Sequence, residues 1–310
     1  MTNYSDHRRA IPPGARVTHE RAADGWPIRV FDWPADSPRG SILWLGGRGD
    51  IFEKYLETIA RWHAAGWTVT SFDWRGQGGS GRLLADTSVG HATGFEAWID
   101  DLAAFWRDWT KRTPGPHILM GHSMGGHLVL RALVERRVAP ARVVLSAPML
   151  GFETAPLPFK LATALARTLG RLVPTRQAWK SNERPGSAAI KREQYLTRDA
   201  DRYADELWWK EHDPSLSLGP PSWAWLGSAY ASVAALEGPG VVERVAARML
   251  VIGTDGDKLV SPAAIRRFAA RLSAAELLMF GPEVAHEVLR EIDAVRDVAL
   301  ARIDSFLHSA

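Results

Sequence analysis

The stretch that decides the fold is His117-Ile118-Leu119-Met120-Gly121-His122-Ser123-Met124-Gly125. Its first four residues form a short apolar run typical of a buried strand, and helical spacing follows from residue 125 to residue 136. Between them lies G-x-S-x-G, the pattern of a nucleophile elbow, in which a serine sits on a sharp turn from strand to helix. Glycines flank the serine because that turn leaves no room for side chains. We therefore predict Ser123 as a nucleophile; the alternative is an ordinary glycine-bounded turn.

Strand-like and helix-like segments alternate on both sides of this turn. Strands are predicted over residues 28–33, 41–45, 67–72, 117–120 and 142–146. Helices are predicted over residues 52–65, 95–109 and 125–136, where apolar residues recur every three or four positions. Parallel strands need crossover connections, so this order predicts an α/β protein with a mostly parallel sheet flanked by helices.

The alternation breaks between residues 149 and 243, which hold eight prolines and no strand pattern. It resumes with an apolar run over residues 249–252 and a strand over residues 276–280. We predict an inserted helical cap over residues 149–243. The core is then made of two parts, residues 1–148 and 244–310.

A serine nucleophile of this kind needs a base and a carboxylate, which follow it in the order acid, then histidine. His286 is the only histidine beyond Asp257 apart from His308 in the terminal tail, so His286 is the predicted base. Asp255 and Asp257 both follow the predicted strand over residues 249–252. Asp257 is the predicted acid, and Asp255 is the alternative, because only one carboxylate is needed on the imidazole.

An oxyanion hole uses two backbone N–H groups, one from the residue after the nucleophile and one from an early strand-to-helix loop. Met124 is the first predicted donor. The loop Gly46-Gly47-Arg48-Gly49-Asp50 follows a buried strand, and its glycines allow a close approach to a substrate oxygen. Arg48 is the predicted second donor.

Further motifs appear in a fixed order: Asp73-Trp74-Arg75-Gly76-Gln77-Gly78-Gly79-Ser80, then residues 121–126, Asp257-Lys258-Leu259-Val260 and His286-Glu287. With the 46–50 loop, they make the chain resemble the α/β-hydrolase superfamily, and within it the lysophospholipase and monoacylglycerol lipase branch. Gly46 departs from the histidine usual in that branch. The resemblance implies a cofactor-independent serine hydrolase that cleaves the ester of a monoacylglycerol or lysophospholipid. A prolyl-aminopeptidase-like peptidase and a non-catalytic hydrolase-fold binding protein are the alternatives.

Composition excludes several other classes. The chain has 310 residues, 46% hydrophobic and 24% charged, a balance typical of a folded globular protein. It has no cysteine, which excludes disulfide scaffolds and cysteine-ligated metals, and a net charge of +3 is too small to suggest nucleic acid. No metal site is predicted, and the G-x-G-x-x-G string at residues 76–81 lacks the following helix that a dinucleotide site needs. We see neither a secretory signal nor a membrane span, and expect a cytoplasmic protein.

The predicted cap carries two features of its own. Trp223 and Trp225 lie where the chain turns back toward the sheet, and we predict that they line an acyl-chain pocket. Leu161, Leu165, Leu169 and Leu172 share one helix face, and Lys160, Thr163, Arg167 and Arg171 share another. A cationic amphipathic helix of this kind fits transient contact with a membrane surface; the alternative is a cap helix with a solvated basic face.

Overall fold

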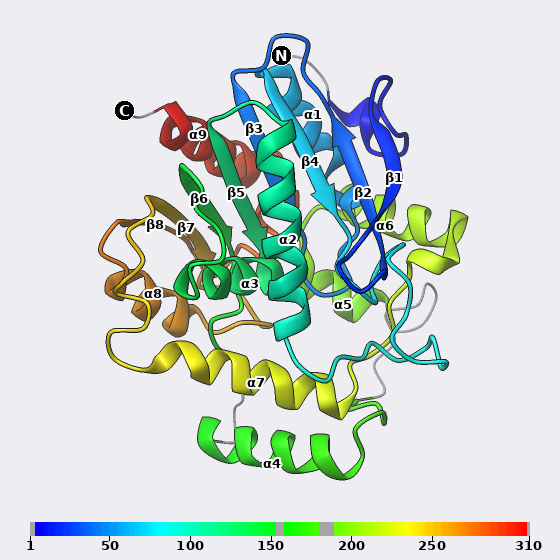
Figure 1. Ribbon diagram of the computed structural model, residues 1–310, viewed down its shortest axis with the longest axis vertical. Coiled ribbons are helices and arrows are strands. Elements are labelled where there is room, and N and C mark those ends of the chain that lie inside the picture. The colour runs from blue at the N-terminus through cyan, green and yellow to red at the C-terminus, as the bar shows by residue number, and fades with distance from the viewer. Residues whose placement is uncertain (1–3, 153–157, 180–188, 309–310) are drawn as a thin grey trace.

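One eight-stranded sheet runs through the protein, seen here in a computed structural model that describes residues 4–152, 158–179 and 189–308 (Figure 1). The described strands are β1 (Arg16–Arg21), β2 (Pro27–Trp33), β3 (Gly40–Leu45), β4 (Trp67–Phe72), β5 (His117–His122), β6 (Arg142–Ser146), β7 (Met249–Thr254) and β8 (Ala275–Phe280). Their order across the sheet is β1-β2-β4-β3-β5-β6-β7-β8. Strand β2 is antiparallel to both of its neighbours, and every other pair is parallel. The predicted α/β class and mostly parallel sheet are confirmed.

Helices cover both faces of this sheet. The described α-helices are α1 (Leu56–Ala64), α2 (Glu96–Arg112), α3 (Ser123–Val134), α4 (Phe159–Leu172), α5 (Ala189–Leu196), α6 (Ala200–His212), α7 (Trp223–Glu237), α8 (Pro262–Arg271) and α9 (Asp293–His308). Side chains of α2, α3 and α8 share one hydrophobic core with Leu43 and Leu45 of β3. Side chains of α1 and α9 share a second core with Ile42 and Trp44 of the same strand. Successive residues of a strand point to opposite faces, so one all-buried strand supplies both cores.

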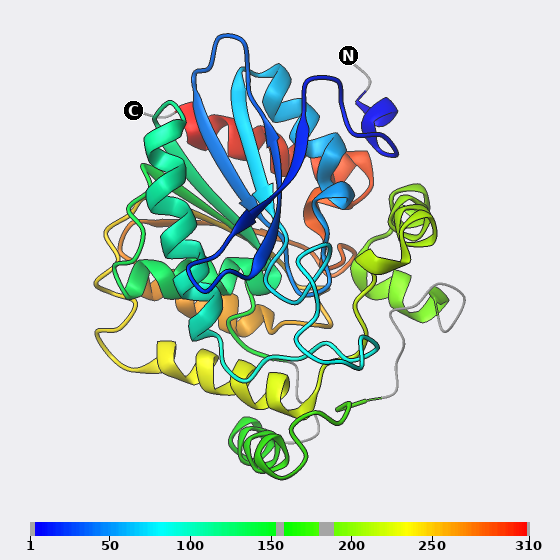
Figure 2. The same cartoon turned by 45° about the vertical axis from the view of Figure 1, so that its right-hand side comes forward.

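Helices α4–α7 lie between β6 and β7 in the chain, and we call them the cap helices. Helix α4 lies beneath α7 and packs against it at the bottom of the molecule in both ribbon views (Figures 1 and 2). The two helices approach closely because small residues meet: a Cβ on Gly170 would lie 2.9 Å from the carbonyl oxygen of Trp223. A Cβ on Gly227 would lie 3.0 Å from the carbonyl oxygen of Ala166.

This small-residue contact decides how the leucine face of α4 is placed. Leu161, Leu165 and Leu172 are 55%, 46% and 71% exposed, whereas Ala166 is buried. The basic residues Arg167 and Arg171 are exposed as well. Most of both predicted stripes of α4 therefore faces outward, with Leu169 and Thr163 half-buried, and α7 is met by a third face built from alanine and glycine.

The carboxyl ends of the parallel strands bring four loops to one edge of the sheet. These are the loop after β3, the turn from β5 into α3, the turn after β7 and the loop after β8. Within the described ranges, no helix is both long and apolar enough to cross a membrane.

Candidate active site

Ser123 stands at the junction of β5 and α3, as the elbow pattern predicts. Its backbone φ is 51°, in the left-handed region that costs a non-glycine residue energy. The neighbouring positions leave no room for side chains: a Cβ on Gly121 would lie 2.7 Å from the backbone of Gly125. A Cβ on Gly47 would lie 2.8 Å from the Cβ of Ser123 itself. The local sequence therefore holds the serine in a strained turn at the start of a helix.

The structure brings Asp257, and not Asp255, to His286. The Oδ2 atom of Asp257 lies 2.6 Å from Nδ1 of His286, and both side chains are almost fully buried. The other carboxylate oxygen of Asp257 accepts hydrogen bonds from the backbone N–H groups of Leu259 and Val260, at 2.8 and 3.0 Å. Asp255 instead makes an exposed ion pair of 2.7 Å with Arg266.

This pairing shifts the pKa values of both partners. Burial would lower the pKa of His286, but the adjacent Asp257 carboxylate, together with Glu287 and Asp50, outweighs it, and the net shift is upward from the ordinary value. Burial would raise the pKa of Asp257, but the His286 imidazole outweighs it, and the net shift is downward. An ionised Asp257 can accept the Nδ1–H of His286, which leaves Nε2 of the neutral ring as a proton acceptor.

Three hydrogen bonds fix the loop after β3. Trp74 Nε1 donates to the Gly46 carbonyl at 2.8 Å, and the Gly47 N–H donates to Asp50 Oδ2 at 2.7 Å. The Gly49 N–H donates to Gln77 Oε1, also at 2.8 Å. The Arg48 peptide thus lies between two anchored glycines. On the other side of Ser123, Met124 is fully buried in the first turn of α3.

Ser123, His286, Arg48 and Met124 all line one cavity of about 590 Å³. Much of its wall is apolar, with lining residues Met149, Phe152, Leu196, Trp225, Leu226 and Val260. Trp179, Tyr195 and Leu259 also line it and are 44%, 43% and 41% exposed, so they form its rim. A volume of this size suits a small organic ligand.

Only one of the two tryptophans predicted for a substrate pocket reaches this cavity. Trp225 lines it, is buried, and lies under the Arg48 guanidinium, 5.1 Å from the ring centroid. Trp223 is not among the lining residues; its backbone N–H donates to the Arg176 carbonyl oxygen, and its own carbonyl oxygen lies next to Gly170 of α4. Residues two apart on a helix point about 200° apart, so they do not share a pocket.

Sequence reasoning did not single out Asp50 or Gln77, although both shape the site. Asp50 Oδ2 also accepts from the Tyr55 hydroxyl at 3.0 Å and contacts His122 Nδ1 at 2.8 Å. Burial would raise the pKa of Asp50, but Lys54 and His122 outweigh it and hold it well below its usual value. The signal for both residues lay inside motifs already noted, Asp50 at the end of the glycine loop and Gln77 within the 76–81 string.

Residues 76–81 form a glycine-rich turn, and the chain after it runs as loop until α2 begins at Glu96. In the part of the chain that the structure describes, no group of three or more histidine, aspartate or glutamate side chains is placed to hold a metal ion. Around Ser123 the structure gathers a buried His286–Asp257 pair and the loop after β3, a set of groups that could support nucleophilic catalysis by a serine.

This fold and this site define an α/β-hydrolase. Residues 36–293 match the family model described as serine aminopeptidase, S33, and the chain belongs to that family. Lysophospholipase L2 of Escherichia coli is 29% identical over 299 residues, which cover 92% of this chain and 85% of that protein. Monoacylglycerol lipase of Mycolicibacterium smegmatis is 27% identical over 280 residues, covering 89% of this chain and 92% of that protein.

A solved structure of a soluble variant of monoglyceride lipase from Saccharomyces cerevisiae is also similar. It superposes with a TM-score of 0.76 at 17% identity, covering 96% of each chain. The chain is thus an α/β-hydrolase of the lysophospholipase and monoacylglycerol lipase branch, a group of carboxylic ester hydrolases.

Proposed function

We propose that this protein hydrolyses the carboxylic ester of a lipid-like substrate, a monoacylglycerol or a lysophospholipid, with Ser123, His286 and Asp257 as its catalytic triad. The observation that carries the proposal is the buried Asp257–His286 pair, whose His286 lines one cavity with a serine held at φ 51°. The names of the two relatives support the substrate class.

The proposed reaction passes through an acyl-enzyme. His286 Nε2 takes the proton of the Ser123 hydroxyl, whose oxygen attacks the ester carbonyl carbon. The negative charge that develops on the carbonyl oxygen is held by the backbone N–H groups of Arg48 and Met124. His286 then gives its proton to the leaving alcohol. In the second half it removes a proton from water, whose oxygen attacks the acyl carbon. His286 then returns that proton to Ser123 Oγ as the bond to the acyl carbon breaks, which releases the fatty acid and restores the serine hydroxyl.

The charges around the cavity favour an ester over an amino-terminal peptide. A peptidase of this fold would need an acidic group for the substrate's ammonium. That alternative is relevant because the matching family is described as a serine aminopeptidase. The acidic residues that line the cavity are Asp50 and Glu287, and both lie 2.6 Å from the ammonium of Lys54. Their charge is already matched, and the rest of the wall suits an acyl chain.

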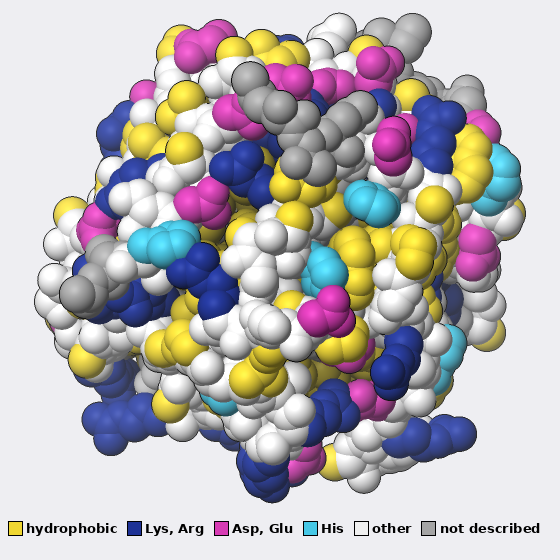
Figure 3. All heavy atoms as spheres, turned by 90° about the horizontal axis from the view of Figure 1, so that it is seen from above, with side chains coloured by type: hydrophobic (Ala, Val, Ile, Leu, Met, Phe, Trp, Pro, Cys, Tyr) yellow, Lys and Arg dark blue, Asp and Glu magenta, His cyan; other side chains and the backbone are white. Residues whose placement is uncertain are grey.

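Residues 149–243 are proposed to act as the cap of this site, and α4 as its contact with a lipid surface. The exposed leucines of α4 and the exposed Arg167 and Arg171 match an amphipathic helix on an anionic interface. The opposite face of the molecule instead has acidic, basic and hydrophobic side chains interspersed (Figure 3). A cytoplasmic protein that visits a membrane peripherally fits this surface.

Two measurements test the proposal. A fluorophosphonate should label wild-type protein and leave Ser123→Ala unlabelled, and Ser123→Ala should lose on the order of 10⁴-fold or more in ester hydrolysis while its thermal unfolding stays unchanged. Turnover of monoacylglycerols, lysophospholipids and aminoacyl amides, compared side by side, then decides the substrate class. Preference for the amides would overturn the ester proposal.

The surface contact is tested separately with vesicles of anionic phospholipid. Wild-type protein should co-sediment with them, and the double variant Leu161→Ser with Leu165→Ser should not. Both proteins should hydrolyse a short water-soluble ester equally, because neither leucine lines the cavity. Equal sedimentation of the two proteins would refute a role for α4.

A further inference from the structure

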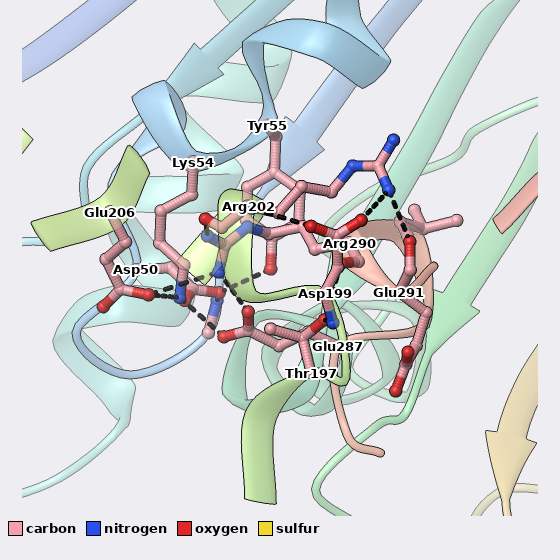
Figure 4. A network of polar contacts seen from close by, with 12 residues as sticks. Asp50, Lys54, Tyr55, Thr197, Asp199, Arg202, Glu206, Glu287, Arg290 and Glu291 are labelled. Atoms are coloured by element: carbon pink, nitrogen blue, oxygen red, sulfur yellow. Dashed lines mark hydrogen bonds and ion pairs between the residues drawn. The ribbon is translucent and has the colours of Figure 1, made fainter. Parts of the chain in front are cut away.

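A buried ammonium lies beside the candidate active site among three carboxylates. Lys54 Nζ is 2.6 Å from Asp50 Oδ1, 2.6 Å from Glu287 Oε1 and 3.0 Å from Glu206 Oε2 (Figure 4). The Lys54 side chain is fully buried, and those of Glu206 and Glu287 are 1% exposed. Ion pairs so deeply buried are costly to form, and removing one partner leaves an uncompensated buried charge.

Acidic and basic side chains alternate through this cluster. Burial would lower the pKa of Lys54, but Asp50, Glu206 and Glu287 outweigh it and raise the pKa above the usual value. Glu206 also contacts Lys210 Nζ at 2.6 Å and Arg290 Nη1 at 3.2 Å, and Glu287 is bonded to Arg290 as well. Three carboxylates thus face three cations.

The members of this cluster come from both parts of the protein. Asp50, Lys54, Glu287 and Arg290 belong to the core, whereas Glu206 and Lys210 belong to the cap helix α6. Glu206 is therefore the cap's carboxylate on Lys54. A second cap–core ion pair joins the same two regions, between Arg202 of α6 and Glu57 of α1, at 2.7 Å.

Asp50 connects this cluster to the loop of backbone donors. One of its oxygens is bound to Lys54, and the other accepts the Gly47 N–H and faces His122, the residue before Ser123. Three contacts therefore lead from the cap to the residue before Arg48: Glu206 to Lys54, Lys54 to Asp50, and Asp50 to Gly47.

We propose that the Lys54–Glu206 ion pair is a positioning contact through which the cap helix α6 fixes Asp50, and with it the Arg48 amide, in the geometry that stabilises the oxyanion. The inference rests on the proposed function, in which that amide is one of two oxyanion donors. Lys54 and Glu206 are positioning residues here, since they act through Asp50 and not on the substrate.

Loss of the Lys54–Glu206 ion pair has different effects if the pair only stabilises the fold and if it positions the loop after β3. If the pair only joins cap to core, its loss lowers stability, and the comparable Glu57–Arg202 pair behaves in the same way. If the pair positions the oxyanion loop, its loss weakens an interaction made only in the transition state. Both kcat and kcat/KM then fall by the same factor, with KM unchanged.

The experiment compares Glu206→Gln with the matched control Glu57→Gln in the full chain, on a short water-soluble ester. Glu206→Gln should lose about 10-fold or more in kcat, short of the roughly 100-fold or more lost when an oxyanion donor is removed outright. The KM of Glu206→Gln should stay within about two-fold of the wild-type value. Both the KM and the kcat of the control Glu57→Gln should stay within the same range. The affinity for an alkylboronic acid, whose tetrahedral adduct with Ser123 mimics the transition state, should fall in parallel with kcat.

Thermal unfolding of each variant controls for stability. Should Glu206→Gln fail to fold, Glu206→Asp keeps the charge but withdraws it from Lys54, and a loss of kcat at constant KM supports the proposal. A Glu206 variant that folds and retains wild-type kcat overturns it, and so does an equal loss in Glu57→Gln. A failure of the proposed function itself would be recognised in the wild-type protein, which would then neither cleave esters nor react with a fluorophosphonate.

Discussion

Asp257 Oδ2 lies 2.6 Å from His286 Nδ1, although the two residues lie in different loops and are 29 positions apart. The neighbouring strands β7 and β8 are parallel, so their carboxyl ends lie side by side and deliver these two loops to one place. Asp255, two residues before Asp257, points to the surface and pairs with Arg266. The turn after β7 thus offers two carboxylates but turns only one toward the imidazole.

This difference provides a matched pair of variants. Asp257→Asn should lower kcat by around 10⁴-fold, because an amide in that place holds His286 in the wrong tautomer. Asp255→Asn should keep nearly wild-type kcat, since it removes only an exposed ion pair. Steady-state kinetics of both variants on one ester make the comparison. The opposite ranking would transfer the orienting role to Asp255.

The pH dependence of kcat/KM should report the raised pKa of His286. The base works only when neutral, so activity should rise with pH through a midpoint above about 6.5 and then level off. In Asp257→Asn the carboxylate that raises this pKa is gone and burial remains, so the residual activity should have its midpoint at lower pH. Profiles measured from about pH 5 to 9 test both statements. A midpoint that does not move in Asp257→Asn contradicts this electrostatic account.

Trp225 lines the cavity and Trp223 does not, so alanine variants of the two residues test whether the cavity holds an acyl chain. Each methylene buried in an apolar pocket contributes about 0.8 kcal/mol, so kcat/KM should rise with acyl-chain length in the wild type. Trp225→Ala should flatten that rise, because Trp225 lines the cavity. Trp223→Ala should keep it, because Trp223 does not line the cavity. A series of esters of increasing chain length measures the slope, and general destabilisation would instead lower activity on every ester alike.

His127 should make the fold sensitive to acid. Burial, with Arg131 nearby, lowers its pKa to about 3, and its Nε2 lies 2.6 Å from the Ser232 hydroxyl of α7. Below about pH 6.5 the unfolded chain binds a proton that the folded protein excludes until about pH 3, so stability is lost as pH falls through this range. At pH 5 the loss amounts to about 2 kcal/mol.

The variant His127→Asn should lose less stability between neutral pH and pH 5 than the wild type does, as measured by urea unfolding. His19→Asn, at an exposed strand position, is the control and should match the wild type. Equal acid losses in His127→Asn and wild type would show that His127 does not titrate in this way.

The fold and most of the site could be predicted because their signals are local. Gly121 and Gly125 mark the elbow, and the apolar runs that become β3, β5 and β7 each end at a loop carrying a site residue. The order of Ser123, Asp257 and His286 then follows from strand succession. Helix α4 shows the limit of this reasoning, because a leucine stripe normally indicates the packed face. Here the closer approach of Ala166 and Gly170 to α7 turns the leucines outward.

The buried ion cluster could not be predicted, for a different reason. Asp50 and Lys54 are four residues apart, a spacing common to exposed helix pairs worth little energy. What makes this pair a buried one is Glu206, more than 150 positions away on a cap helix. No local pattern indicates a contact at that sequence separation. The motif at residues 76–81 likewise contains Gln77 but does not indicate its partner, because Gly49 lies on another loop.

The placement of β7 and β8 also has a consequence for protein synthesis. The elbow and the loop after β3 are translated before the cap helices, whereas Asp257 and His286 are translated after them. A nascent chain that has emerged only as far as β6 therefore carries the serine with neither its base nor its acid. Its serine stays no more reactive than an ordinary hydroxyl. If Ser123, Asp257 and His286 are the catalytic triad, as proposed, hydrolytic capacity begins only when the strands translated after the cap have joined the sheet.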